Sequence, residues 1–399
     1  FLMIRRPPRS TLVRSSAASD VYKRQPIIRP SNPQHQSHYR FVIAILAIMQ
    51  NAFFGASFFV IGPITPYLID DYKISHGAAG LLTASVILAQ SVLSIPFSIL
   101  IGRVRLKTIV SIGWLLSAAP VITVLTDNFT SLLLTRIVYG IALAAIIPAQ
   151  AALVISWFNS RERLLMNALI TAAAPIAMTV STMIAAPVAD VIGWKLLLTL
   201  LGGFNLLGWC AWMFFGKSEG ELLGQSLDFK SAWTTLRSKT ALLLAAADAG
   251  PFAQYCALVA WLPTFYFETQ GFSLAKAGSM VGLLPLAGGI TLLVISSLSM
   301  TIRNRHGILL YSGFAIGISG FGTFLLAGTP LGYIPLIALG AASWLYLPVL
   351  LTIAMEIPGL TTRQVSIVCA TILSIGGLLS FASHFICLLY TSPSPRDRG

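Results

Sequence analysis

Long apolar segments dominate this chain of 399 residues and constrain its fold more than any other feature. A helix needs about 20 consecutive apolar residues to cross a hydrocarbon core of ~30 Å. Because backbone groups in hydrocarbon must be satisfied within the structure itself, long continuous segments predict helices, whereas a β-barrel would show short alternating stretches. We therefore expect an all-α integral membrane protein. Its eleven expected helices lie near 41–68, 77–101, 108–126, 131–155, 165–187, 194–215, 240–267, 275–299, 307–327, 331–354 and 365–386.

Charge composition excludes most other classes of protein. Charged residues make up 10% of the chain, against about 25% in soluble domains, which argues against a soluble enzyme, a disordered chain or a nucleic-acid module. The formal net charge is +13, but eight of the 26 Lys and Arg residues lie in the two ends. Segments 1–25 and 387–399 resemble translated sequencing adapters, and we set both aside. Residues 26–40 are expected to form an N-terminal tail.

The cations between the apolar segments predict the orientation of the chain. Alternate loops between the segments face the same side of the membrane. One set of loops holds three cations and the other holds twelve, and the positive-inside rule places the set with twelve in the cytoplasm. This bias predicts a multi-pass protein of the plasma (inner) membrane with a cytoplasmic N-terminus. The three are Lys73, Lys195 and Lys276, and the twelve are Arg103, Arg105, Lys107, Arg161, Arg163, Lys217, Lys230, Arg237, Lys239, Arg303, Arg305 and Arg363.

An internal repeat relates the two sides of a polar central loop at 217–239. Motifs recur in the same order at an offset of about 200 residues, which is typical of parallel repeats in transporters. The repeat predicts an N-terminal bundle at 41–216 and a C-terminal bundle at 240–386. Six segments precede the loop and five follow it, so we expect a C-terminal bundle that lacks its last helix. The paired motifs are Ser75-x-x-x-Ala79-Gly80 with Ser273-x-x-x-Ala277-Gly278, and Arg103-x-Arg105 before Gly113 with Arg303-x-Arg305 before Gly313.

Two motifs resemble those of the major facilitator superfamily, and the resemblance covers roughly residues 41–386. Arg136-Ile-Val-Tyr-Gly140-Ile-Ala142 is similar to the family's R-x-x-x-G-x-G pattern in the fourth helix, with Ala in the last place. Arg103-Val-Arg105-Leu-Lys107 resembles a degenerate form of the family's loop 2–3 signature, which usually has an Asp where Gly102 stands and a glycine where Arg105 stands.

The resemblance implies two pseudo-symmetric six-helix bundles and transport by alternating access. For the loop motif and its repeat it implies a gating role, and these residues are Arg103, Arg105, Lys107, Arg303 and Arg305.

Two charged residues, Arg136 and Asp248, lie well inside the expected helices, away from their ends. A charge at the bilayer centre costs ~2.5–3.5 kcal/mol on insertion scales, so such residues are candidates for function. The resemblance gives Arg136 a role in binding substrate or in proton coupling, and the alternative is snorkelling to the outer interface. Asp248 is our candidate for proton coupling, because burial penalises the charged form of a carboxyl. The alternative places Asp248 near the headgroups without a partner.

Uncharged polar and aromatic residues cluster near the middle of the first, seventh and tenth helices. The resemblance places these helices, with the fourth, around a central cavity, so the residues are candidates for binding substrate. Hydrogen bonding between helices is the competing explanation. They are Gln50, Asn51, Gln254, Tyr255, Trp344 and Tyr346.

The expected function is that of a secondary active transporter. No metalloprotease, serine-hydrolase or Walker motif is present, and the four cysteines lack metal-ligand or disulfide spacing. We therefore expect no enzyme activity, cofactor, metal or nucleic-acid partner. The hypothesis is a monomer that moves a small anionic solute, attracted by Arg136, and couples it to protons or another ion. Alternatives are a facilitative uniporter or a drug-type efflux carrier, followed by a channel, a receptor or a membrane-embedded enzyme.

Overall fold

The computed structural model describes residues 38–100, 104–125, 127–158, 160–217, 233–234, 237–298, 305–355, 357 and 362–391. All regular elements in these residues are helical, as expected. Ten helices are long and apolar enough to cross a membrane, and α15 (Thr362–Thr391) contains a shorter apolar stretch at Val368–Ser383. The part of the chain that the structure describes therefore accounts for all eleven expected segments.

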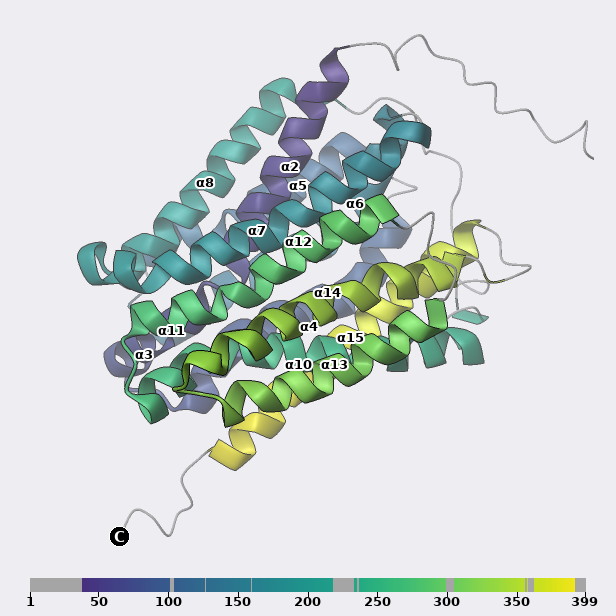
Figure 1. Cartoon of the computed structure of the whole chain (residues 1–399). Helices are drawn as coiled ribbons and strands as arrows, with labels where there is room; N and C mark the ends of the chain where they lie inside the picture. Colours follow the sequence, from purple (N-terminus) through teal and green to yellow (C-terminus); the bar gives the residue numbers. More distant parts are fainter. Residues whose placement is uncertain are drawn as a thin grey trace, which may run out of the picture. The chain divides into compact units, whose positions relative to one another are not determined.

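The elements fall into two groups along the chain (Figure 1). The first group consists of α2 (Tyr39–Phe58), α3 (Ile61–Tyr72), α4 (His76–Leu100), α5 (Leu106–Ser117), η3 (Ala119–Leu125), α6 (Phe129–Trp157), α7 (Ser160–Ile192) and α8 (Trp194–Phe215). The second consists of α10 (Lys239–Gln270), α11 (Leu274–Val281), α12 (Leu283–Leu298), α13 (Arg305–Leu325), η4 (Pro330–Gly332), α14 (Tyr333–Met355) and α15.

Packing within the two groups follows one pattern, which confirms the repeat. In the first group α2 packs on α7, and α4 and α5 each pack on α6. In the second group the equivalent helices pair in the same way: α10 packs on α15, and α12 and α13 each pack on α14. We call the two groups the first and second halves of the molecule.

The halves contact each other through two equivalent pairs of helices. These are α4 with α15 and α7 with α11 and α12, and α3 adds a contact with α10. Figure 1 shows α7, α12 and α14 lying side by side across this boundary. Glycines permit the close approach, since a Cβ on Gly278 would lie 2.7 Å from the carbonyl oxygen of Thr182.

The first expected helix, 41–68, is broken in the structure into α2 and α3. Pro63 lacks the N–H that would bond the carbonyl of Phe59 four residues earlier, and that carbonyl instead accepts from Gly62 N at 3.1 Å. Residues 59 and 60 lie between the two helices. The break leaves the last carbonyls of α2 without partners in the helix.

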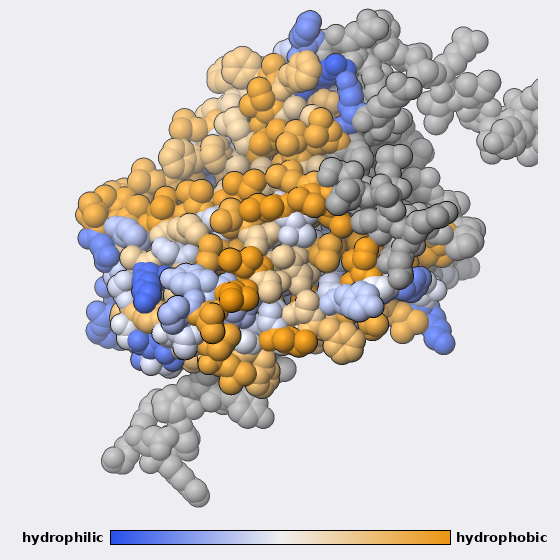
Figure 2. Space-filling view, viewed as in Figure 1, coloured by the Kyte–Doolittle hydropathy of each residue, from blue (hydrophilic) through white to orange (hydrophobic). Residues whose placement is uncertain are grey.

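The surface that the structure describes is largely apolar. Figure 2 shows hydrophobic residues over most of the viewed face, with hydrophilic residues gathered toward the helix ends. Large apolar side chains such as Val191 and Phe214 are each 83% exposed. A soluble protein rarely exposes contiguous apolar patches of this kind, so the surface is suited to contact lipid.

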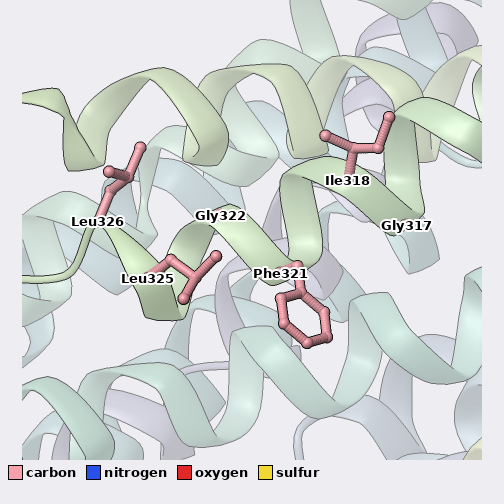
Figure 3. A pocket seen from close by; sticks show the side chains of 6 residues that line it. All are labelled: Gly317, Ile318, Phe321, Gly322, Leu325 and Leu326. Atoms are coloured by element: carbon pink, nitrogen blue, oxygen red, sulfur yellow. The ribbon is translucent and has the colours of Figure 1, made fainter.

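An apolar groove lies on α13 and faces outward. Figure 3 shows its lining, which consists of Gly317, Ile318, Phe321, Gly322, Leu325 and Leu326. None of these residues carries a polar side chain, so the groove offers no hydrogen bond to a hydrophilic solute. A hydrophilic solute would therefore need polar groups elsewhere in the molecule.

Candidate functional site

Arg136 on α6 binds the end of the broken first helix. Its Nη1 and Nη2 atoms donate to the carbonyls of Ser57 at 2.9 Å and Phe58 at 2.7 Å, and its Nε donates to the carbonyl of Leu82 on α4 at 3.2 Å. The side chain is 1% exposed, and its guanidinium lies 5.2 Å from the centroid of the Tyr139 ring. A cation at a helix C-terminus is favourable because it faces the negative end of the helix dipole.

The three carbonyls that accept hydrogen bonds from Arg136 all belong to the first half, on α4 or at the end of α2. The guanidinium joins α2, α4 and α6 through main-chain oxygens, so snorkelling to the interface is not its arrangement here. No carboxylate is among these partners. The predicted role of Arg136 in substrate binding stays a prediction.

Asp248 on α10 is buried against two other helices of the second half. The hydroxyl of Tyr346 on α14 donates to its Oδ1 at 2.8 Å. Its Oδ2 lies against α15, where a Cβ on Gly376 would be 2.1 Å away. The carboxyl is 1% exposed, so it is not the solvated, unpartnered group near the headgroups that was the alternative.

Three aromatic residues meet where the halves join, and we call Phe59, Tyr255 and Trp344 the aromatic junction. Phe59 lies in the break of the first helix, and its ring contacts that of Tyr255 edge-on with centroids 6.3 Å apart. Tyr255 contacts Trp344 in the same manner at 5.8 Å. The Trp344 indole N–H faces the Tyr255 oxygen, and neither group has another hydrogen-bond partner among the described residues.

The junction and the buried carboxyl lie along one face of α10. Tyr255 follows Asp248 by seven residues, which is two helical turns and about 10 Å. Trp344 and Tyr346 both come from α14, so the two helices contribute to both features. Gly288 of α12 makes room for the indole, because a Cβ there would lie 2.1 Å from Trp344 Cδ1.

The three predicted amide residues differ in their surroundings. Gln254 donates from Nε2 to the carbonyl of Ile316 on α13 at 3.3 Å, inside the second half. Asn51 donates to the carbonyl of Ala47 in its own helix at 3.2 Å. Gln50 is buried, and its Nε2 has no hydrogen-bond partner in the described chain. Of the three amide nitrogens, that of Gln50 is the one that makes no hydrogen bond within the described chain.

The predicted gating residues are partly described. Arg105 is exposed and directly precedes α5, and Lys107 donates to the carbonyl of Met213 on α8 at 3.4 Å. Arg305 is the first residue of α13, whereas Arg103 and Arg303 lie outside the described residues. Their gating role is not tested by these contacts.

The halves are also in contact at the helix ends that lie away from the predicted gating residues. We call these ends the outer end, after the orientation predicted from the sequence. His76 Nε2 of α4 lies 2.9 Å from Glu268 Oε1 of α10, both about two-fifths exposed. Nearby, a Cβ on Gly62 of α3 would lie 2.9 Å from the carbonyl oxygen of Val259. The sequence motifs did not single out this ion pair.

Comparison with curated proteins identifies several transporters as relatives. The chain is 21% identical over 290 residues to the uncharacterized protein Cj0987c of Campylobacter jejuni, with 71% of this chain and 90% of the relative covered. It is 25% identical over 246 residues to a probable L-galactonate transporter of Escherichia coli, with 56% and 54% covered. It is 28% identical over 179 residues to an MFS-type efflux pump of Mycolicibacterium smegmatis, with 44% and 42% covered. The chain thus spans about half or less of the last two.

Solved structures share the fold at low sequence identity. A D-xylose–proton symporter superposes with a TM-score of 0.68 at 15% identity, covering 87% of this chain and 89% of its own. A nucleoside transporter gives a TM-score of 0.69 at 13% identity, with 89% and 92% covered. The family model of the Major Facilitator Superfamily matches residues 47–381. With the repeated packing described above, this match shows that the chain belongs to the Major Facilitator Superfamily of transporters.

Proposed function

We propose that the protein is a secondary active transporter that moves a small solute by alternating access of its two halves and couples that movement to protons at Asp248. The observation that carries the coupling is the buried carboxyl, whose Oδ1 accepts from the Tyr346 hydroxyl at 2.8 Å. Burial penalises the charged form of a carboxyl, and a neighbouring hydroxyl can satisfy it in either protonation state.

The position of the carboxyl supports a link between its proton and the boundary of the halves. Gly376 of α15 lies against Asp248, whereas the next residue, Gly377, lies against Ser91 of α4 in the first half. A Cβ on Gly377 would come within 1.8 Å of the Ser91 Oγ. Movement of the carboxyl therefore acts on a helix that packs tightly against both halves.

The names of the relatives are consistent with the proposal that this protein carries a solute. One curated relative is named a probable transporter of L-galactonate, another an efflux pump, and one structural neighbour a proton symporter of D-xylose. These names differ in solute and direction, so they support a carrier without selecting its substrate.

Uptake into proteoliposomes tests the proposal. Vesicles that contain the protein receive a defined mixture of sugars, sugar acids and nucleosides, with and without a pH gradient that is acidic outside. We expect a protein-dependent accumulation of a solute that saturates, shows counterflow and exceeds equilibrium only with the gradient. Asp248→Asn should abolish accumulation above equilibrium and retain exchange. Asp70→Asn, at a carboxyl whose side chain is 81% exposed, is the matched control.

Three outcomes would contradict parts of the proposal. Flux that never exceeds equilibrium would indicate a uniporter. Accumulation only with the opposite gradient would indicate an efflux carrier that exchanges solute for protons. Accumulation by Asp248→Asn equal to that of the unchanged protein would refute the coupling role of this carboxyl.

A further inference from the structure

We infer that the solute carried at the aromatic junction has no net charge, and that it is a molecule with hydrogen-bond acceptors and an apolar face. The inference rests on the proposed function and names the class of its substrate. It replaces the anionic solute that the sequence predicted.

Charges are scarce in the interior of the helices. Of the Asp, Glu, Lys and Arg residues in the helices that the structure describes, only Arg136 and Asp248 lie more than one turn from the end of a membrane-crossing segment. A charged solute in this low-dielectric region needs an opposite charge close by, because an unpaired ion there is far less stable than in water. Within the described helices, a counter-charge must therefore come from these two residues.

Arg136 is not accessible to an anion in this structure. Each of its three nitrogens donates to a backbone carbonyl, and the side chain is almost fully buried. Moving the guanidinium to a solute would leave the carbonyls of Ser57 and Phe58 buried without partners, which is unfavourable. Arg136 therefore stabilises the break of the first helix and offers an anion no charge.

Asp248 is equally closed to a cation. Its Oδ1 accepts from Tyr346, its Oδ2 lies against Gly376, and the residue is 1% exposed. A buried carboxyl of this kind can take up a proton, whereas it presents no accessible surface to an ammonium group of a solute. Both interior charges are thus occupied by protein groups.

The groups that remain are uncharged donors and aromatic faces. The Trp344 indole N–H faces the Tyr255 oxygen, and the Tyr255 O–H has no acceptor of ordinary geometry among the described residues. Tyr255 is only 5% exposed. Buried polar groups usually have partners, so the Tyr255 O–H indicates that something else supplies an acceptor. Their rings, with that of Phe59 from the other half, provide apolar surface for a flat solute face.

Matched pairs of solutes test the charge of the substrate. Proteoliposomes receive an equimolar mixture of D-xylose with D-xylonate, L-galactose with L-galactonate, and uridine with uridine monophosphate, and mass spectrometry measures what the vesicles retain. We expect an uncharged member to accumulate at least tenfold over its anionic partner. Accumulation of an anion equal to or above that of its uncharged partner would overturn the inference. So would the absence of protein-dependent accumulation of every uncharged member.

A conservative variant tests the place of binding. Tyr255→Phe removes a hydroxyl whose O–H has no acceptor of ordinary geometry among the described residues, so we expect thermal stability to change little and the KM for the solute to rise at least threefold. Tyr311→Phe is the matched control, because Tyr311 is 72% exposed on α13 and should change neither quantity. An unchanged KM in Tyr255→Phe would refute binding at the junction.

The same vesicles separate this inference from the proposed coupling. If an uncharged solute equilibrates regardless of the pH gradient, the substrate class holds and the proton coupling at Asp248 fails. If an anion accumulates with the gradient and the Asp248→Asn variant loses that accumulation, the coupling holds and the substrate class fails.

Discussion

Replacing Arg136 should destabilise the first half of the protein. In Arg136→Met the carbonyls of Ser57 and Phe58 lose their donors in a buried place, whereas the carbonyl of Leu82, inside α4, keeps its helical hydrogen bond. Two unsatisfied carbonyls at about 1–3 kcal/mol each would sum to roughly 2–6 kcal/mol. Removing a buried cation offsets part of this cost, so we expect a net loss of about 1–3 kcal/mol.

Arg136→Lys separates the charge from the shape of the side chain. An ammonium is a single point of donation, whereas the guanidinium presents a planar fork. We therefore expect Lys to keep one of the three hydrogen bonds and to lose about half as much stability as Met.

Unfolding in mixed detergent micelles, followed by tryptophan fluorescence, measures these differences. Arg237→Met is the control, because Arg237 is exposed and its loss should change stability by no more than about 0.5 kcal/mol. If Arg136→Lys is as stable as the unchanged protein, the three carbonyl contacts do not explain why Arg is needed. If Arg136→Met is fully stable and fails only in transport, the residue acts on the solute and the inference of an uncharged substrate loses its main support.

Three further changes probe the contacts around the site. Gly376→Ala should abolish gradient-driven uptake, because the added methyl would displace the buried carboxyl of Asp248. Gly313→Ala is the control and should match the unchanged protein, because no described atom outside its own helix backbone lies within 4 Å of the position of its added Cβ. Equal uptake by both variants would contradict the role of the contact between Gly376 and Asp248. His76→Cys with Glu268→Cys, in a chain without its native cysteines, should be joined by a short bifunctional thiol cross-linker, which should stop uptake. Continued uptake by the cross-linked protein would show that the outer end need not open. Gln254→Met should lower thermal stability and leave KM within about twofold, because the amide bonds within the second half; a large change in KM would return this residue to the solute site.

The sequence alone was sufficient for the architecture and for part of the site. Long apolar segments and the repeat at an offset of about 200 residues predicted the helices and the equivalence of the halves, both confirmed here. Asp248 and Tyr346 were each singled out as interior polar residues. Their contact was not predicted, because it depends on how α10 and α14 are rotated about their axes.

Arg136 shows why the remaining contacts could not be predicted. Its partners are main-chain oxygens, which every residue possesses, so nothing in the side-chain sequence marks them. The break at Phe59 had a partial signal in Pro63, since a proline removes one helical hydrogen bond but does not by itself show how far the chain departs from the helix. The contact of Gly376 with the carboxyl likewise depends on tertiary packing.

The break in the first helix also has a mechanical consequence. On one side of it, α2 packs on α6, α7 and α8 of its own half, whereas on the other side α3 also packs on α10 and α11 of the second half. A straight helix would transmit any tilt of one half directly into the other. A joint at residues 59 and 60 instead lets the outer piece stay with its neighbours while the inner piece turns. The amides at this joint should therefore exchange their hydrogens faster than those of α2 and α3 on either side.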